Sequence, residues 1–238
     1  MLFLCFSLIS LQLQAQTFSL VANTWPPYVD SALYENGLAM NIVKTAFARV
    51  GYTPEIRIEK WEKALKGSEM GVYDIVGALW KTKEREQTLL YSDPYLTNNI
   101  VLITHSQSHF KFNSLDDLKG VLIGVLNGYE YDEDFMKDHQ ILKFQANRLT
   151  QNLISVQNGK LDMAVADKRL AMYELKHFMG NNIKDFRFLA KPLNSRQLYI
   201  AAPIERPESK NLITKFNQGL AEIKKDGTYQ KILDKYMF

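Results

Sequence analysis

Two short apolar segments constrain the fold of this chain more than any other feature. One covers Asp74–Leu79 (DIVGAL) and the other covers Val121–Leu126 (VLIGVL). A strand that is apolar along its whole length is buried on both faces, so other layers must cover both sides of its sheet. Segments with apolar residues at helical spacing, Gly37–Val50 and Leu149–Asn158, alternate with such strands along the chain. The alternation predicts an α/β fold.

The length and composition allow a sizeable core and argue against several classes of protein. A chain of 238 residues, 46% of them hydrophobic, can form one domain or two small ones. Its formal net charge is +3 and its Lys and Arg residues form no stripe, unlike those of a nucleic-acid-binding protein. The four histidines lack the pattern of a metal site, and no nucleotide-binding loop or serine-hydrolase motif is found. We therefore expect no metal, no cofactor and no nucleic-acid partner.

The N-terminal segment indicates export. Residues 1–13 are almost wholly apolar and uncharged, and the chain then turns polar. This run is short for a transmembrane helix and is typical of a secretory signal, here residues 1–15 with Ala15 before the cleavage point. It departs from the usual signal in having no Lys or Arg at its start. Cleavage would remove Cys5, the one cysteine, so thiol catalysis is not expected and we predict a periplasmic protein.

A polar connection follows the first apolar strand. It runs from Trp80 to Glu84 and leads to Arg85, whose guanidinium has five donors in a rigid fork that suits a carboxylate. Thr82 lies three residues earlier and can cap a helix that begins there, and helix N-termini favour anions. These residues allow an anion site, although a solvent-exposed arginine in a surface turn is the commoner outcome.

Two further segments place chemically useful side chains at the ends of strands. Asn23–Tyr28 contains two consecutive prolines, which force an extended turn and present Trp25 and Tyr28 from a stiff backbone. Either ring can anchor the core or contact a ligand, and the residues alone favour neither outcome. Leu161–Asp167 is predicted to be a strand that ends in an acid, and Asp167 can cap the next helix or bind a cationic group.

The sequence around Arg85 resembles the signature of family 3 of the extracellular solute-binding proteins. These are the amino-acid-binding components of ABC importers, and their signature is T-x-E-R followed by F-S-x-P-Y. This chain has TKER at 82–85 and LYSDPY at 90–95. The GKLDMAVAD segment at 159–167 and the IKKDGTYQKILDKY segment at 223–236 are also similar to the family. The resemblance covers nearly all of the chain after the leader.

The resemblance implies a two-lobed α/β architecture, the type II periplasmic-binding-protein or Venus-flytrap fold, with a ligand cleft between the lobes. Lobe one is expected to comprise residues 17–96 and 195–238, and lobe two residues 99–192. The hinge crossings are expected near 96–99 and 192–195.

The resemblance also implies roles for particular side chains. In the family, the threonine and arginine that match Thr82 and Arg85 hold the ligand's α-carboxylate. The acid that matches Asp167 pairs with its α-ammonium. Aromatic residues form apolar and stacking walls, and the matching positions here are Trp25, Tyr28, Trp61 and Trp80.

One loop departs from the family pattern. Family members have Ser and Thr after the glycine that matches Gly128, and those hydroxyls help to hold the carboxylate. This chain has Tyr129, Glu130 and Tyr131 there. A glutamate repels a carboxylate and attracts a cation or a hydroxyl-rich group. Gly128, Tyr129 and Glu130 are therefore candidate ligand contacts, and they argue against an ordinary amino acid as the ligand.

The predicted function is that of a monomeric periplasmic binding protein, not an enzyme. It is expected to capture a small polar solute, an amino acid or a related compound, and to deliver it to the permease of an ABC importer. Two alternatives stay open on the same scaffold. One is a ligand-sensing receptor with a signalling partner, and the other is a periplasmic enzyme similar to cyclohexadienyl dehydratase.

Overall fold

The structure is a computed structural model that describes residues 16–236, so the predicted signal segment, residues 1–15, lies outside the described residues. Its strands are β1 (Gln16–Asn23), β2 (Tyr52–Glu59), β3 (Ile75–Trp80), β4 (Leu89–Tyr91), β5 (Leu96–His105), β6 (Leu122–Leu126), β7 (Leu142–Ala146), β8 (Met163–Asp167), β9 (Phe186–Phe188) and β10 (Asn194–Pro203). Its α-helices are α1 (Leu38–Arg49), α2 (Trp61–Glu69), α3 (Glu133–Lys137), α4 (Leu149–Gln157), α5 (Lys168–Glu174), α6 (Ser209–Lys225) and α7 (Thr228–Lys235). Its other helical segments, of the 3-10 or π type, are η1 (Tyr34–Asn36), η2 (Arg85–Gln87), η3 (Leu115–Leu118), η4 (Leu175–Met179) and η5 (Gly180–Asp185).

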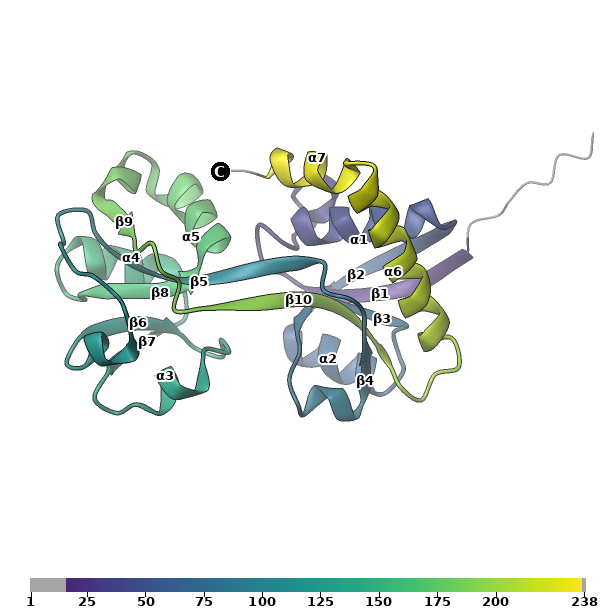
Figure 1. The fold of residues 1–238 in the computed structure, drawn as a ribbon, viewed down its shortest axis with the longest axis horizontal. Coiled ribbons are helices and arrows are strands. Elements are labelled where there is room, and N and C mark those ends of the chain that lie inside the picture. Colours follow the sequence, from purple (N-terminus) through teal and green to yellow (C-terminus); the bar gives the residue numbers. More distant parts are fainter. Residues whose placement is uncertain (1–15, 237–238) are drawn as a thin grey trace, which may run out of the picture.

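Figure 1 shows two groups of elements joined by the long strands β5 and β10. We call β1–β4 with α1, α2, α6 and α7 the first lobe. Its strand β1 pairs in parallel with both β2 and β3. Helices α1, α6 and α7 lie on one side of these strands and α2 lies on the other (Figure 1). β3, the predicted DIVGAL strand, is buried at every position because helices cover both of its faces.

We call β6–β9 with α3–α5 the second lobe. Its strand β6 is the predicted VLIGVL segment and pairs in parallel with β7 and β8. Helices α4 and α5 pack their apolar faces on this sheet through Leu149, Leu153 and Leu170. The predicted alternation of buried strands with covering helices is therefore found in both lobes.

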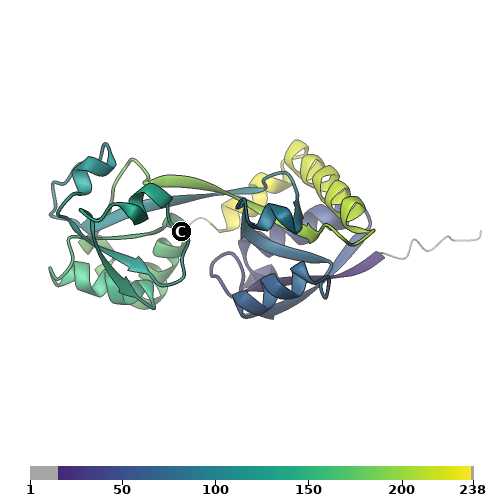
Figure 2. The ribbon, with the colours of Figure 1, turned by 90° about the horizontal axis from the view of Figure 1, so that it is seen from below.

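Strands β5 and β10 connect the lobes, as Figure 2 shows from a second direction. They pair antiparallel with each other over 96–100 and 194–198. β10 then continues along β3 and β4, and β5 continues along β8 and β9. The strand order β2-β1-β3-β10-β5-β8-β6-β7 makes one sheet through both lobes. The predicted α/β class is confirmed, and the residue boundaries given above for the lobes stay a prediction.

The described part of the chain contains no membrane-spanning segment. Within residues 16–236, no helix combines the length and the apolar character that crossing a bilayer requires.

Helices α1 and α6 pack against each other at very short range. α1 ends at Arg49, and Gly51, two residues later, adopts the positive φ of 80° that glycine tolerates. The contact between the helices is at Gly219 of α6, where a Cβ atom would lie 1.9 Å from the carbonyl oxygen of Ala46. A rigid backbone oxygen cannot move aside as a flexible side chain could, so this position requires glycine.

We predict that Gly219→Ala destabilises the protein. The added methyl group gains helix propensity but forces α6 away from α1, and overpacking of this kind costs about 1–3 kcal/mol. Urea unfolding followed by circular dichroism measures the change. The exposed neighbour provides the control, because Gln218→Ala should change the free energy of unfolding by no more than about 0.5 kcal/mol. Equal stability of the two variants would show that the helices separate without cost.

Candidate functional site

A small cavity of about 150 Å³ lies between the lobes. Residues of both lobes line it: Asn23, Trp25, Trp61, Ala78, Leu79, Trp80 and Arg85 from the first, and Gly128, Tyr129 and Glu130 from the second. Seven of the ten predicted ligand contacts are therefore brought together. The three that do not line the cavity are Tyr28, Thr82 and Asp167.

The cavity lies at the carboxyl ends of parallel strands. Asn23 ends β1, Trp80 ends β3, and Gly128 follows β6 by two residues. The connections that leave these ends face one another across the crevice between the lobes, which is where open α/β sheets bind ligands. The sheet therefore explains why residues from distant parts of the sequence meet here.

Four aromatic rings line the cavity. The ring of Trp80 meets those of Trp25 and Tyr129 edge-on, with centroids 5.5 and 5.1 Å apart. Its indole Nε1 donates to Oδ1 of the buried Asn98 at 3.0 Å, which fixes the ring plane. Trp61 also lines the cavity, so all three tryptophans of the chain are found there.

Arg85 is nearly buried, with 9% of its surface exposed. Its Nη1 donates to the carbonyl oxygen of Trp80 at 3.0 Å, and its guanidinium lies over the ring of Trp61, 5.0 Å from the centroid. The hydroxyl of Thr82 accepts a hydrogen bond from the Arg85 backbone N–H at 3.3 Å. Thr82 therefore holds the turn that carries the arginine and does not itself line the cavity. Arg85 is therefore not a solvent-exposed arginine in a surface turn, which was the commoner alternative from the sequence.

Glu130 of the second lobe forms an ion pair with Arg85 of the first. Its Oε1 accepts from Arg85 Nη2, and its Oε2 lies 3.4 Å from Nη1 of both Arg85 and Arg196. Arg196 lies on β10, with its guanidinium 4.8 Å from the ring centroid of Trp80. The departure noted at this loop therefore places a carboxylate directly on the arginine that was predicted to bind one.

Asp167 and Tyr28 form a buried pair behind the cavity wall. The Tyr28 hydroxyl donates to Asp167 Oδ1 at 2.6 Å, and Asn98 Nδ2 donates to Oδ2 at 3.1 Å. Asp167 also caps α5 by accepting from the Leu170 backbone N–H at 2.9 Å. Burial raises the pKa of Asp167 above its ordinary value, against the opposing effect of these hydrogen bonds. Both side chains are fully buried, so Tyr28 supports the cavity only through its contact with Trp25, 4.6 Å between ring centroids.

Sequence reasoning missed four residues around the cavity. Asn23, Ala78 and Leu79 adjoin predicted contacts, so a wider window around each strand end would have included them. Ala78 adopts a φ of 59°, which is uncommon for a residue other than glycine and is often found at functional sites. Arg196 carries no sequence signal, because only the placement of β10 near the connection that follows β6 brings it next to Glu130.

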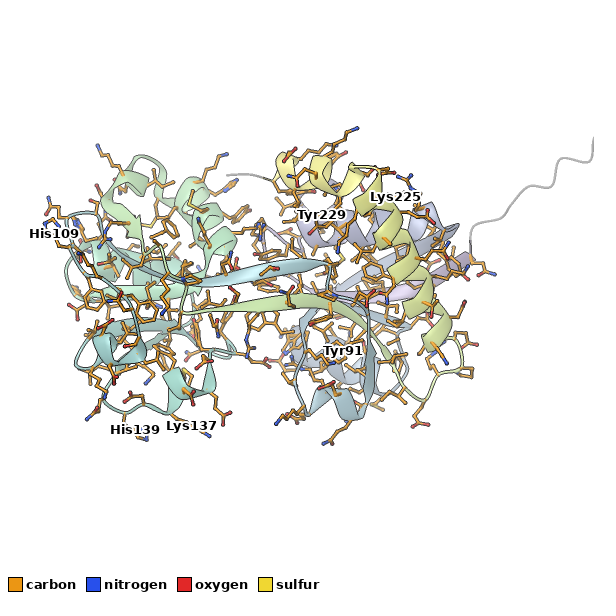
Figure 3. The ribbon with its side chains drawn as sticks, in the orientation of Figure 1. Tyr91, His109, Lys137, His139, Lys225 and Tyr229 are labelled. Atoms are coloured by element: carbon orange, nitrogen blue, oxygen red, sulfur yellow. The ribbon has the colours of Figure 1, made fainter. Side chains whose placement is uncertain are left out.

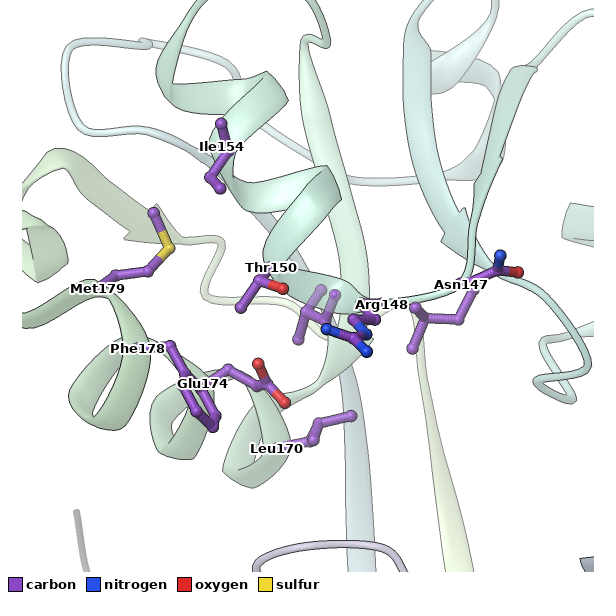
Figure 4. Close-up of a pocket in the computed structure, with 10 residues that line it drawn as sticks. Asn147, Arg148, Thr150, Ile154, Leu170, Glu174, Phe178 and Met179 are labelled. Carbon is purple, nitrogen blue, oxygen red and sulfur yellow. The ribbon is translucent and has the colours of Figure 1, made fainter.

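A larger cavity of about 530 Å³ lies within the second lobe (Figure 4). Its lining comes from one lobe alone and includes none of the predicted contacts. Burial raises the pKa of Glu174 there, and the nearby Arg148 opposes that rise. The lining residues are Leu126, Asn147, Arg148, Leu149, Thr150, Ile154, Leu170, Glu174, Phe178 and Met179. Because the interlobe cavity brings together seven of the predicted contacts and this one includes none, we take the interlobe cavity as the candidate site.

Two of the four histidines can be located in Figure 3. His109 lies at the outer end of the second lobe and His139 at its lower edge, both on the side away from the first lobe (Figure 3). Among the described residues, no three His, Cys, Asp or Glu side chains are placed to hold a metal ion.

Sequence comparison identifies a protein family that matches this chain along most of its length. The profile of the bacterial extracellular solute-binding proteins, family 3, matches residues 20–238. The chain is 26% identical to ABC transporter arginine-binding protein 1 of Escherichia coli K12, over 91% of this chain and 88% of that one. It is 24% identical to the arginine-binding periplasmic protein of Mannheimia haemolytica, over 94% and 92%. It is also 25% identical to membrane-bound lytic murein transglycosylase F of Desulfosudis oleivorans, but covers only 46% of that protein.

Solved structures share the fold. The ligand-binding core of GluR0 from Nostoc punctiforme, solved with L-glutamate, has a TM-score of 0.72 at 19% identity and covers 92% of this chain and 99% of that one. A mutant of ArgBP from T. maritima has a TM-score of 0.70 at 23% identity, with coverages of 92% and 94%. A histidine kinase sensor domain similar to periplasmic binding proteins has a TM-score of 0.72 at 17% identity, with coverages of 94% and 97%. The predicted two-lobed architecture is confirmed.

We predict that Tyr28→Phe destabilises the protein in a pH-dependent way. A hydrogen bond to a charged group contributes about 1.5–3 kcal/mol, and its loss leaves the buried Asp167 with fewer donors. The folded-state pKa of Asp167 already lies above the unfolded value, so its contribution to stability is greatest below about pH 4 and falls as the pH rises through the folded-state pKa. Loss of the donor raises that pKa further, so the fall continues to a higher pH and its total becomes larger.

Urea unfolding at about pH 4 and about pH 7 tests this prediction. The deficit of Tyr28→Phe relative to the parent protein should be larger at the higher pH. Tyr34→Phe, at an exposed tyrosine, is the control. A deficit that does not change with pH would contradict a charged Asp167 as the partner of the hydroxyl.

Proposed function

Because this chain belongs to family 3 of the bacterial extracellular solute-binding proteins, we propose that its interlobe cavity captures a small polar solute, an amino acid or a related compound. The predicted solute-binding function is confirmed at the level of the family. The observation that carries the choice of solute is Arg85, a nearly buried guanidinium at the cavity that is fixed by Trp80 and Trp61. Such a group binds a carboxylate in two places.

The cavity supports a pose for the solute. Its carboxylate lies at Arg85, and the rest of the molecule lies among Trp25, Trp80 and Tyr129. Trp25 Nε1 and the Tyr129 hydroxyl are buried and have no hydrogen-bond partner within the described part of the chain. Buried polar groups are normally paired, so these two atoms are available to hydrogen-bonding groups of the solute. Contact with both lobes would then favour their closed arrangement, because a ligand shifts a conformational equilibrium by its difference in affinity.

The proposed setting is the periplasm, with residues 1–15 as the export signal. The names of the relatives include periplasmic proteins and components of ABC transporters. We accordingly propose that this protein works as a monomer, delivers its solute to an ABC permease and binds no nucleic acid. A sensor receptor would use the same cavity with another partner, but the likeness to a kinase sensor domain is one of fold alone.

We propose that the protein is not an enzyme. General acid–base catalysis commonly needs a pair of ionisable groups that can reach the substrate. The carboxylate that lines the cavity is Glu130, which two arginines hold, and Asp167 is fully buried behind the wall. The similarity to the murein transglycosylase covers less than half of that protein.

A thermal-shift screen tests the proposed solute class. The purified protein is heated with amino acids, polyamines, small organic acids and short peptides. A solute at a hundred times its dissociation constant adds roughly 2.7 kcal/mol of stability. We expect L-arginine and related amino acids to raise the melting temperature, since the named relatives bind arginine.

We predict that Arg85→Ala abolishes this rise. Removal of one partner from a buried, hydrogen-bonded charge pair costs about 2–5 kcal/mol of binding free energy. Arg57→Ala, at an exposed arginine outside the cavity lining, is the matched control and should keep the full shift. If Arg85→Ala remains folded and shifts as the parent does, the solute does not use this arginine. If amino acids stabilise neither protein, the solute belongs to another class.

A further inference from the structure

We infer that Glu130 is an internal competitor for the solute's carboxylate and a contact that closes the lobes without solute. This inference rests on the proposed function, because it concerns the same cavity. It starts from the position of the glutamate. Glu130 lies in the connection that follows β6 in the second lobe, whereas Arg85 lies between β3 and β4 in the first. Their ion pair therefore spans the crevice between the lobes.

The pair has the geometry of a bound carboxylate. Both oxygens of Glu130 lie within hydrogen-bonding reach of the two terminal nitrogens of Arg85, which is the two-point contact expected of a ligand carboxylate. Arg85 is fixed by its bond to the Trp80 carbonyl and by the ring of Trp61. Glu130 thus occupies the place on Arg85 that a solute's carboxylate needs, and the two cannot bind there together.

Glu130 is able to leave this place when a solute arrives. Its side chain is 37% exposed, whereas that of Arg85 is 10% exposed. The Glu130 carboxylate can therefore be hydrated when it leaves Arg85, whereas the Arg85 guanidinium stays shielded from water. Arg196 already lies 3.4 Å from Glu130 Oε2 and offers a second cation to which the freed carboxylate can turn. When a solute displaces Glu130, its carboxylate replaces that of Glu130 on Arg85. The buried charge of Arg85 therefore keeps a partner throughout.

The competition has a measurable consequence for affinity. The apparent dissociation constant of a solute rises in inverse proportion to the fraction of protein whose site is free of the internal carboxylate. A partly exposed ion pair contributes about 1 kcal/mol, which corresponds to a roughly three- to tenfold weaker apparent affinity for carboxylate-bearing solutes. Solutes that lack a carboxylate do not need to displace Glu130 and avoid this loss.

Three variants test the inference against the parent protein. Glu130→Gln removes the charge, and Glu130→Asp keeps the charge but shortens the side chain so that it reaches Arg85 poorly. Glu86→Gln is the matched control, because Glu86 pairs with Lys81 within the first lobe and does not line the cavity. Titration calorimetry uses two probes: L-arginine, and agmatine, which is the same molecule without its carboxylate.

We expect Glu130→Gln and Glu130→Asp to bind L-arginine roughly three- to tenfold more tightly than the parent. Their affinity for agmatine should be unchanged or weaker, and Glu86→Gln should match the parent for both probes. Equal or weaker binding of L-arginine by Glu130→Gln overturns the inference, since Glu130 is then idle or holds the solute. A gain for Glu130→Gln alone also overturns it, because a general charge effect and not the contact would be responsible.

Small-angle X-ray scattering of the solute-free proteins separates this inference from the proposed function. Loss of the cross-lobe ion pair should increase the radius of gyration of Glu130→Gln and leave that of Glu86→Gln unchanged. If no protein binds L-arginine, the proposed solute fails, but an expanded Glu130→Gln still supports closure by Glu130. An unchanged radius in that case overturns the inference as well.

Discussion

One amide side chain, that of Asn98, joins the strands between the lobes to the cavity wall and to the buried acid. It lies in the paired part of β5 and is fully buried. Its Oδ1 accepts from Trp80 of the first lobe, and its Nδ2 donates to Asp167 of the second. A buried amide must satisfy both of its polar atoms, so neither lobe can change its position on β5 without breaking a bond here. The aromatic wall and the connection between the lobes are therefore one structural unit.

The charged groups around the cavity have partners within the protein. Arg85 and Arg196 share Glu130, and the donors on Asp167 are a tyrosine hydroxyl, an amide and a backbone N–H. Burying a charge without a partner is expensive, so each of these groups needs its contacts even when no solute is bound. The charged groups suited to binding an amino acid thus already have partners within the protein, and a solute must offer better partners than these.

Much of the fold and part of the cavity were predictable from the sequence. The remaining contacts were not, and the reason is physical. The two apolar strands are local patterns, and the TKER segment is a local motif, so both could be read directly. The pairing of Arg85 with Glu130 joins residues 45 positions apart, and Arg196 is 66 positions from Glu130. Such contacts depend on how β6 and β10 are placed in three dimensions, which no local pattern records. The same holds for Asp167, because its full burial follows from the packing of Tyr28 against it.

The placement of the tryptophans determines what the intrinsic fluorescence of this protein reports. The chain has three, Trp25, Trp61 and Trp80, and each lines the interlobe cavity, where two of them lie beside guanidinium groups. Indole emission depends on the polarity and charge around the ring, and in this molecule the whole of that emission originates at one place. The intrinsic tryptophan fluorescence of the protein therefore reports on the state of its cavity alone. No tryptophan elsewhere in the chain contributes to the signal.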